Sequence, residues 1–86
     1  TMSVNDYNEF ESLKIYPNPT SNILNISINR YENVPVKIYD ISGRLVKEET
    51  LQNDVLQMNM KELNSGIYLL KIQLGKKSII RRIIKQ

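Results

Sequence analysis

Apolar and polar residues alternate along most of this chain, in short runs separated by turn residues. Between Ile23 and Asn29, for example, Leu24, Ile26 and Ile28 occupy every second position. A period of two places alternate side chains on opposite faces of a strand, so it predicts one buried and one solvated face. By the same pattern we expect strands over residues 13–16, 23–29, 34–39, 45–51, 55–60, 67–74 and 78–85.

Turn residues separate these runs. Pro17 and Pro19 fix φ and lack an N–H, so residues 17–20 must turn between two extended pieces. Gly43 is expected to supply the positive φ of a hairpin turn over residues 40–44. Further turns are expected at 52–54 and 75–76, and a turn or a single 3₁₀ turn at 61–66, with Leu63 in the core and Gly66 releasing the chain.

Two strands need a further argument. The run from Ile67 to Leu74 is apolar on both faces, which predicts a place near the middle of a sheet. The run from Ser78 to Lys85 also fits one helical face, but its four isoleucines favour a strand. Pro35 comes near the start of its strand, where a missing donor is tolerated at an edge.

Seven short strands with turn signals between most of them predict an all-β protein, a seven-stranded antiparallel β-sandwich. Eighty-six residues suit one small domain. We expect the folded domain to occupy residues 13–86 and residues 1–12 to be a polar linker. Thr1-Met2-Ser3 reads as a cloning remnant, which would make the chain a piece of a larger protein.

The composition argues against catalysis. The chain has no histidine and no cysteine, which removes the usual general base, nucleophile and zinc ligands. The nine acidic residues are spread over positions expected to be exposed, and they form no calcium-binding cluster. We therefore expect no enzyme, no metal and no cofactor. No run approaches the length of a membrane span, and no signal peptide is visible.

The net charge of +3 conceals an asymmetry along the chain. The first 11 residues carry three acids and no base, and no acid follows Glu62. The basic C-terminal end could meet an anionic surface, but lysine and arginine also protect an edge strand from aggregation. Charge alone favours the edge strand. Bases and aromatics do not interleave on one strand, so the chain is not expected to bind nucleic acid.

Four segments together resemble a known family. They are LKIYPNPT at 13–20, VKIYDISGRLV at 36–46, LNSGIYLLKI at 63–72 and the basic, isoleucine-rich tail at 76–85. Their order and spacing resemble the type A C-terminal sorting domain of the type IX secretion system. The resemblance covers residues 13–86 and implies a seven-stranded, immunoglobulin-like β-sandwich, in agreement with the strand count.

The resemblance also implies a function. Such domains form the C-terminus of larger exported proteins of Bacteroidota and direct them from the periplasm across the outer membrane to the cell surface or medium. The implied partners are the N-terminally fused cargo, the outer-membrane translocon and a sortase-like protease that removes the domain. A protease binds an extended segment, so cleavage is expected in or before residues 1–12.

The implied translocation signal lies in the tail, and translocon recognition is assigned to residues that cluster there: Lys76, Lys77, Arg81, Arg82, Ile83, Ile84 and Lys85. Pairing of this final strand with a receptor would use its unpaired backbone groups. An exposed final strand also leaves a strand-mediated dimer open.

A second group of residues is expected to act mainly through the fold: Pro17, Asn18, Pro19, Gly43, Gly66 and Tyr68. The Pro-Asn-Pro segment has two readings, a rigid turn or part of a recognised surface, and turn chemistry alone explains it. Tyr68 shares a face with Leu70 and Ile72, which predicts core packing with its hydroxyl satisfied.

An alternative function remains open, because a β-sandwich does not imply one function. The chain could be an immunoglobulin- or fibronectin-like accessory module that binds carbohydrate or protein beside an enzyme. Carbohydrate modules usually present tryptophan or several exposed aromatics, whereas this chain has no tryptophan, five tyrosines and one phenylalanine. The sequence therefore favours the sorting domain.

Overall fold

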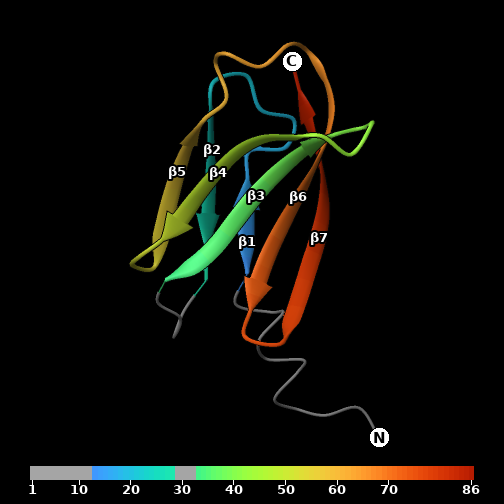
Figure 1. Ribbon diagram of the computed structural model, residues 1–86. Coiled ribbons are helices and arrows are strands. Elements are labelled where there is room, and N and C mark those ends of the chain that lie inside the picture. Colours follow the sequence, from blue (N-terminus) through green and yellow to red (C-terminus); the bar gives the residue numbers. More distant parts are fainter. Residues whose placement is uncertain (1–12, 29–32) are drawn as a thin grey trace, which may run out of the picture.

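The structure, a computed structural model, describes residues 13–28 and 33–86. Within these ranges the chain forms seven strands in two layers (Figure 1). The strands are β1 (Lys14–Tyr16), β2 (Ile23–Ser27), β3 (Val34–Asp40), β4 (Leu45–Leu51), β5 (Val55–Asn59), β6 (Gly66–Leu74) and β7 (Lys77–Lys85). The predicted all-β class and the seven strands are confirmed. β2 ends at Ser27, before the predicted end at residue 29. Residue 29 and residues 30–32 of the polar connection expected at 30–33 lie outside the described residues.

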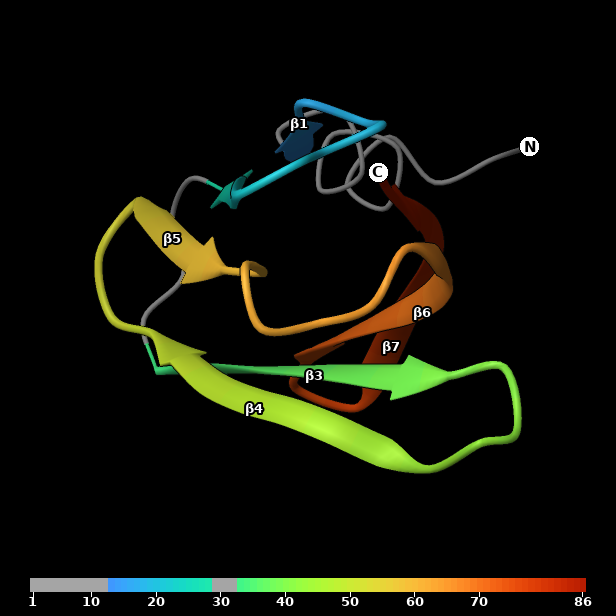
Figure 2. The same cartoon turned by 90° about the horizontal axis from the view of Figure 1, so that it is seen from above.

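The two layers are a three-stranded sheet, in the order β1-β2-β5, and a four-stranded sheet, in the order β4-β3-β6-β7. Viewed from above, the two sheets face each other across the molecule (Figure 2). Every strand pair is antiparallel, as predicted. This arrangement is an immunoglobulin-like sandwich, in which the inner faces of the two sheets supply the core.

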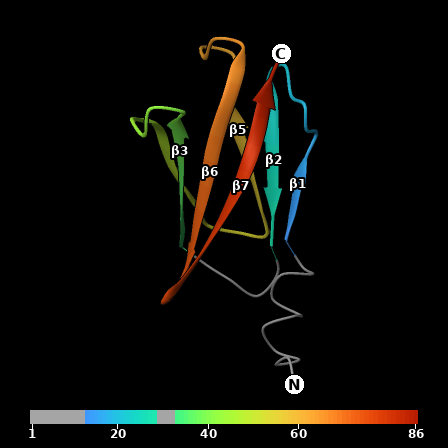
Figure 3. The same ribbon diagram turned by 90° about the vertical axis from the view of Figure 1, so that its right-hand side faces the viewer.

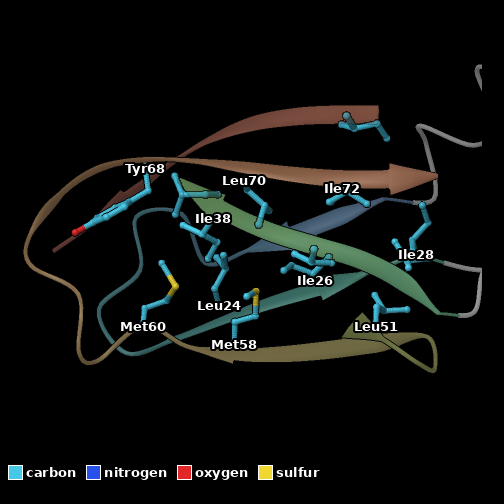
Figure 4. Close-up of a cluster of buried hydrophobic side chains, with 14 of the residues drawn as sticks. Leu24, Ile26, Ile28, Ile38, Leu51, Met58, Met60, Tyr68, Leu70 and Ile72 are labelled. Atoms are coloured by element: carbon cyan, nitrogen blue, oxygen red, sulfur yellow. The ribbon is translucent and has the colours of Figure 1, made fainter. Parts of the chain in front are cut away.

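The core follows the period-two pattern of the sequence. On β6, Tyr68, Leu70, Ile72 and Leu74 are buried, and on β2 the buried residues are Leu24 and Ile26. Figure 4 shows the side chains of both strands, except Leu74, meeting between the sheets, together with Met58 and Met60. The Tyr68 hydroxyl reaches the rim of this cluster and donates to the Asn64 carbonyl oxygen at 2.7 Å, so the predicted satisfied hydroxyl is confirmed.

The strand order of the four-stranded sheet determines which strands lie at its edges. β6 lies between β3 and β7, so its predicted inner position is confirmed. β3 is also an inner strand, whereas the sequence placed Pro35 at an edge. The proline is tolerated because β3 pairs with β6 only from Val36 onward, one residue after Pro35. β4 and β7 are the edge strands of this sheet.

Two glycines have the backbone conformations that the turns require. Gly43 has φ of 92° in the β3–β4 hairpin, and its N–H donates to the Asp40 carbonyl oxygen at 3.0 Å. Gly66 has φ of 154° where the 61–66 turn enters β6. A Cβ at either position would meet no atom within 4 Å, so backbone conformation and not close packing selects glycine. Leu63 packs against the core from this turn, as predicted.

Candidate functional site

The tail that the sequence singled out is β7, which runs along one edge of the four-stranded sheet (Figure 3). Its side chains alternate between two faces. Ile79 and Ile83 point inward and are buried, whereas Ile80, Arg82 and Ile84 lie on the outer face and are exposed. β7 pairs with β6 over its whole length, from Lys77 opposite Leu74 to Lys85 opposite Gly66. The position of β7 is therefore fixed on one side by the inner strand β6.

The other side of β7 is contacted by a segment from the start of the domain. We call residues 18–20 the clasp. The Asn18 side chain accepts a hydrogen bond from the Ile84 N–H at 3.0 Å and donates one to the Arg82 carbonyl oxygen at 3.1 Å. Its amide thus pairs with β7 as a peptide group of a neighbouring strand would. The motif near the beginning of the domain and the tail meet at one place.

Thr20 completes the clasp with its backbone. Its N–H donates to the Ile84 carbonyl oxygen at 2.9 Å, and its carbonyl oxygen accepts from the Gln86 N–H at 2.8 Å. These bonds make a parallel bridge between Thr20 and Lys85. The Thr20 side chain is only 1% exposed, and its hydroxyl donates to the Ile23 carbonyl oxygen at 2.8 Å. Thr20 was quoted in the motif but not predicted as a site residue, because no local pattern relates it to Lys85 at the other end of the domain.

The two prolines flank the residue that holds the tail. Both the Tyr16–Pro17 and the Asn18–Pro19 peptide bonds are cis. β1 ends at Tyr16, immediately before the first proline, as the sequence predicted. The clasp follows at the end of the sandwich where β7 also ends (Figure 3). The Pro-Asn-Pro turn therefore has a definite structural partner, the C-terminal end of β7.

The predicted recognition residues separate into two groups. Ile83 is fully buried and Lys85 is 9% exposed, with the Lys85 ammonium donating to the Gln86 carbonyl oxygen at 2.9 Å. The other five have exposed side chains: Lys76, Lys77, Arg81, Arg82 and Ile84. In the folded domain only this second group presents side chains to a partner.

An aliphatic patch lies on the outer face of β6 and β7. Ile67 lies directly opposite Ile84, and Leu69 and Ile80 extend the patch along the two strands. All four side chains are between 39% and 57% exposed. Neighbouring exposed aliphatics on one sheet face are typical of a contact surface. We call these four residues the outer patch.

The charged residues of β6 and β7 around the outer patch are all basic. The sequence of β6 and β7 contains no aspartate or glutamate, and Lys71 and Arg82 lie opposite outer-patch residues. The Asp40 carboxyl in the β3–β4 hairpin accepts hydrogen bonds from the Ser42 hydroxyl and the Arg44 N–H. These two contacts hold the pKa of the Asp40 carboxyl below its usual value.

The described part of the chain offers little for catalysis. Within residues 13–28 and 33–86, no three His, Cys, Asp or Glu residues are grouped in a way that could hold a metal ion. A shallow hollow on the outer face is lined by Pro35, Lys37, Lys71 and Gln73, and these residues supply no paired acid and base. None of the described residues forms a helix long and apolar enough to cross a membrane.

We predict that Asn18→Ala loosens the end of β7 without unfolding the domain. Two hydrogen bonds at an exposed site are lost, which is expected to cost about 1 kcal/mol in the free energy of unfolding. Hydrogen exchange should show a faster Ile84 amide and an unchanged amide in the middle of β6. Asn25→Ala is the matched control, because it removes one exposed hydrogen bond from the Asn25 side-chain amide to the Tyr16 carbonyl oxygen and leaves β7 untouched. Equal Ile84 exchange in both variants would contradict a holding role for Asn18.

Comparison with known proteins identifies the family. The model of the family described as "Secretion system C-terminal sorting domain" matches residues 14–86. The chain belongs to this family. It is a sorting domain of the type IX secretion system, and the resemblance found in the sequence is confirmed. Such a domain is the signal by which an exported cargo is sorted, and it is not itself a catalytic unit.

Three characterised relatives contain a similar stretch. An endo-acting ulvan lyase of Formosa agariphila is 30% identical over 61 residues, which is 70% of this chain. A funoran endo-beta-hydrolase of Wenyingzhuangia aestuarii is 32% identical over 83 residues, or 92% of the chain. The ulvan lyase NLR42 of Nonlabens ulvanivorans is 32% identical over 73 residues, or 84% of the chain.

The matched stretch is a small part of each relative. It covers 12%, 11% and 14% of the three proteins in the same order. The lyases and the hydrolase therefore have most of their length outside the sorting domain, which agrees with a sorting domain fused to a larger cargo. Export to the cell surface or the medium follows from membership of the family.

A solved structure supports the fold. The chain resembles part of PorZ, described as an essential bacterial surface component of the type-IX secretion system of Porphyromonas gingivalis. The TM-score is 0.79 at 22% sequence identity, covering 98% of this chain and 13% of that one. At this identity the likeness concerns the fold, and it agrees with the predicted sandwich.

Proposed function

We propose that this sorting domain carries an N-terminally fused cargo through the periplasm to the outer-membrane translocon, which reads the exposed side chains of the tail. The observation that carries the proposal is the position of β7 at a sheet edge, where Lys76, Arg81, Arg82 and Ile84 are accessible together. Ile83 and Lys85 would contribute by holding β7 in place.

The cargo and its processing complete the proposal. The named relatives are lyases and a hydrolase, so a polymer-degrading enzyme is the kind of cargo we propose. Residues 13–86 would act as the folded signal and residues 1–12 as the linker to the cargo. A sortase-like protease would cut in or before that linker, because a protease must bind an extended segment. Cleavage there would release the cargo without disturbing the sandwich.

We expect the 86-residue chain to export a passenger. A periplasm-targeted fluorescent protein would be fused to its N-terminus and expressed in a bacterium with a type IX system. Fluorescence should appear at the surface or in the medium, and it should return to the periplasm when the translocon is disabled. The control is the passenger alone. Fluorescence that stays periplasmic while the domain is folded would contradict the proposal and favour the accessory-module alternative.

A further inference from the structure

The clasp covers only one part of the free edge of β7. Both the N–H and the carbonyl oxygen of Ile84 point away from β6, since both bond to the clasp. In an antiparallel strand the backbone groups of every second residue point to the same side. β7 pairs with β6 without a register shift, so the backbone groups of Ser78, Ile80 and Arg82 also point to this edge.

The edge before the clasp is open among the described residues. The Arg82 carbonyl oxygen is taken by Asn18, and the Ile80 carbonyl oxygen accepts only a long 3.3 Å bond from the Arg81 side chain. No described residue accepts a hydrogen bond from the N–H of Ile80 or Arg82. An edge with outward donors is a template for an additional strand.

The side chains beside this edge indicate the character of the added strand. Ile80 is 57% exposed and belongs to the outer patch, and Arg82 follows it on the same face. Arg81 is the other charged side chain along the open edge. β6 and β7 contain no acidic residue to balance its charge. A strand that alternates acidic and aliphatic residues would place carboxylates beside Arg81 on one face. Its aliphatic side chains would then lie beside Ile80 on the outer face and extend the outer patch.

A second copy of this chain fits the edge less well. Two β7 strands paired antiparallel would bring two sets of basic residues, including Arg81 and Arg82, into one sheet with no acid between them. Like charges on neighbouring strands oppose pairing. The charge of β7 therefore favours an acidic protein partner over self-association.

We propose that the edge of β7 from Ser78 to Arg82 is a strand-addition site for an extended, acidic and aliphatic segment of a partner protein, and that the clasp sets its C-terminal limit. This deepens the proposed function, on which it rests, by stating how a protein of the export machinery engages the tail. Backbone bonds to Ile80 and Arg82 fix the register, and Arg81 selects for acidic residues.

The first test uses a defined probe. The ¹⁵N-labelled 86-residue chain is titrated with the acetylated, amidated peptide SEVEVEIS, followed by amide shifts and hydrogen exchange. The Ile80 and Arg82 amides should shift and slow in exchange, while the Ile84 amide, already bonded to the clasp, should change little. The matched peptide SKVKVKIS should bind at least tenfold more weakly. Absence of binding, equal binding of both peptides, or a β7-mediated dimer in sedimentation of the chain alone would each overturn the proposal.

The second test removes one backbone donor. Ile80→Pro deletes an N–H that points to the free edge, so the β6–β7 ladder is kept. Ile80→Thr keeps the donor and β-branching and is the matched control. Ile80→Pro should weaken SEVEVEIS binding at least tenfold, whereas Ile80→Thr should weaken it less than threefold. Circular dichroism and thermal unfolding verify that both variants are folded. Arg81→Glu gives a further variant, which should lose the peptide without any backbone change.

Export of the fluorescent fusion separates this site from the sorting role. Reduced export of both Ile80→Pro and Arg81→Glu supports strand addition. Normal export of these variants, with loss of export on removing residues 83–86, would overturn strand addition and leave the tail as the signal. Normal export in every case would contradict the proposed role of the tail itself.

Discussion

Deleting Ile83 to Gln86 is expected to abolish export of a fused passenger. The deletion removes the buried Ile83 side chain and every backbone bond that Thr20 makes to the tail. It also removes Ile84, one of the exposed residues proposed for recognition. The measurement is passenger fluorescence at the surface and in the medium, compared with the periplasm. Export that continues undiminished would show that the signal is not at this end of β7.

Removing four residues also weakens the fold, so a second variant must separate stability from recognition. Arg81→Glu combined with Arg82→Glu reverses the charge of two exposed side chains and leaves the buried face of β7 intact. Exposed substitutions usually change stability by roughly 0.5 kcal/mol or less. The thermal midpoint should therefore hold while export falls. Deletion of Gln86 alone is the mild control, since it removes one hydrogen bond to Thr20 and one from the Lys85 side chain.

Replacing Ile83 by alanine is expected to destabilise the domain far more than the same change at Ile84. Ile83 is fully buried between the sheets, whereas Ile84 is 39% exposed on the outer face. Truncating a buried isoleucine to alanine costs about 2–5 kcal/mol, from lost transfer free energy and the cavity left behind. In a domain of this size that lowers the thermal midpoint by roughly 10 °C or more.

The Ile84→Ala variant is the matched control for this experiment. It removes the same atoms from the neighbouring position of the same strand, and its backbone bonds to the clasp are kept. We expect a loss of about 1 kcal/mol or less, because the side chain is only partly removed from water. Thermal and urea unfolding of both variants, followed by circular dichroism, give the comparison. Equal losses in the two variants would contradict the inward orientation of Ile83.

Much of the fold was predictable because its information is local. The alternation on β2 and β6 places Leu24, Ile26, Leu70 and Ile72 on buried faces, and the structure confirms each of them. The four isoleucines of β7 were ambiguous between helix and strand. The preceding glycine turn and their β-branching favoured the strand, which the structure contains.

The candidate site was predicted only in part, because its arrangement is not local. The sequence located a basic, isoleucine-rich tail but treated Ile83 and Ile84 alike, although one is buried and the other exposed. From the sequence, turn chemistry alone also explained the Pro-Asn-Pro segment. Asn18 instead bonds to Ile84, 66 positions away, and no pattern within a short window reports such a contact.

The sequence by itself determined where strands and turns lie and which side chains face the core, because a period of two and the φ restrictions of proline and glycine act within a few residues. Only the tertiary structure decided that β3 is an inner strand and that Asn18 and Thr20 cover one end of the β7 edge. Strand order and edge contacts are set by how two sheets bury their apolar faces against each other. That packing depends on residues far apart along the chain, so it places the site where local pattern does not reach.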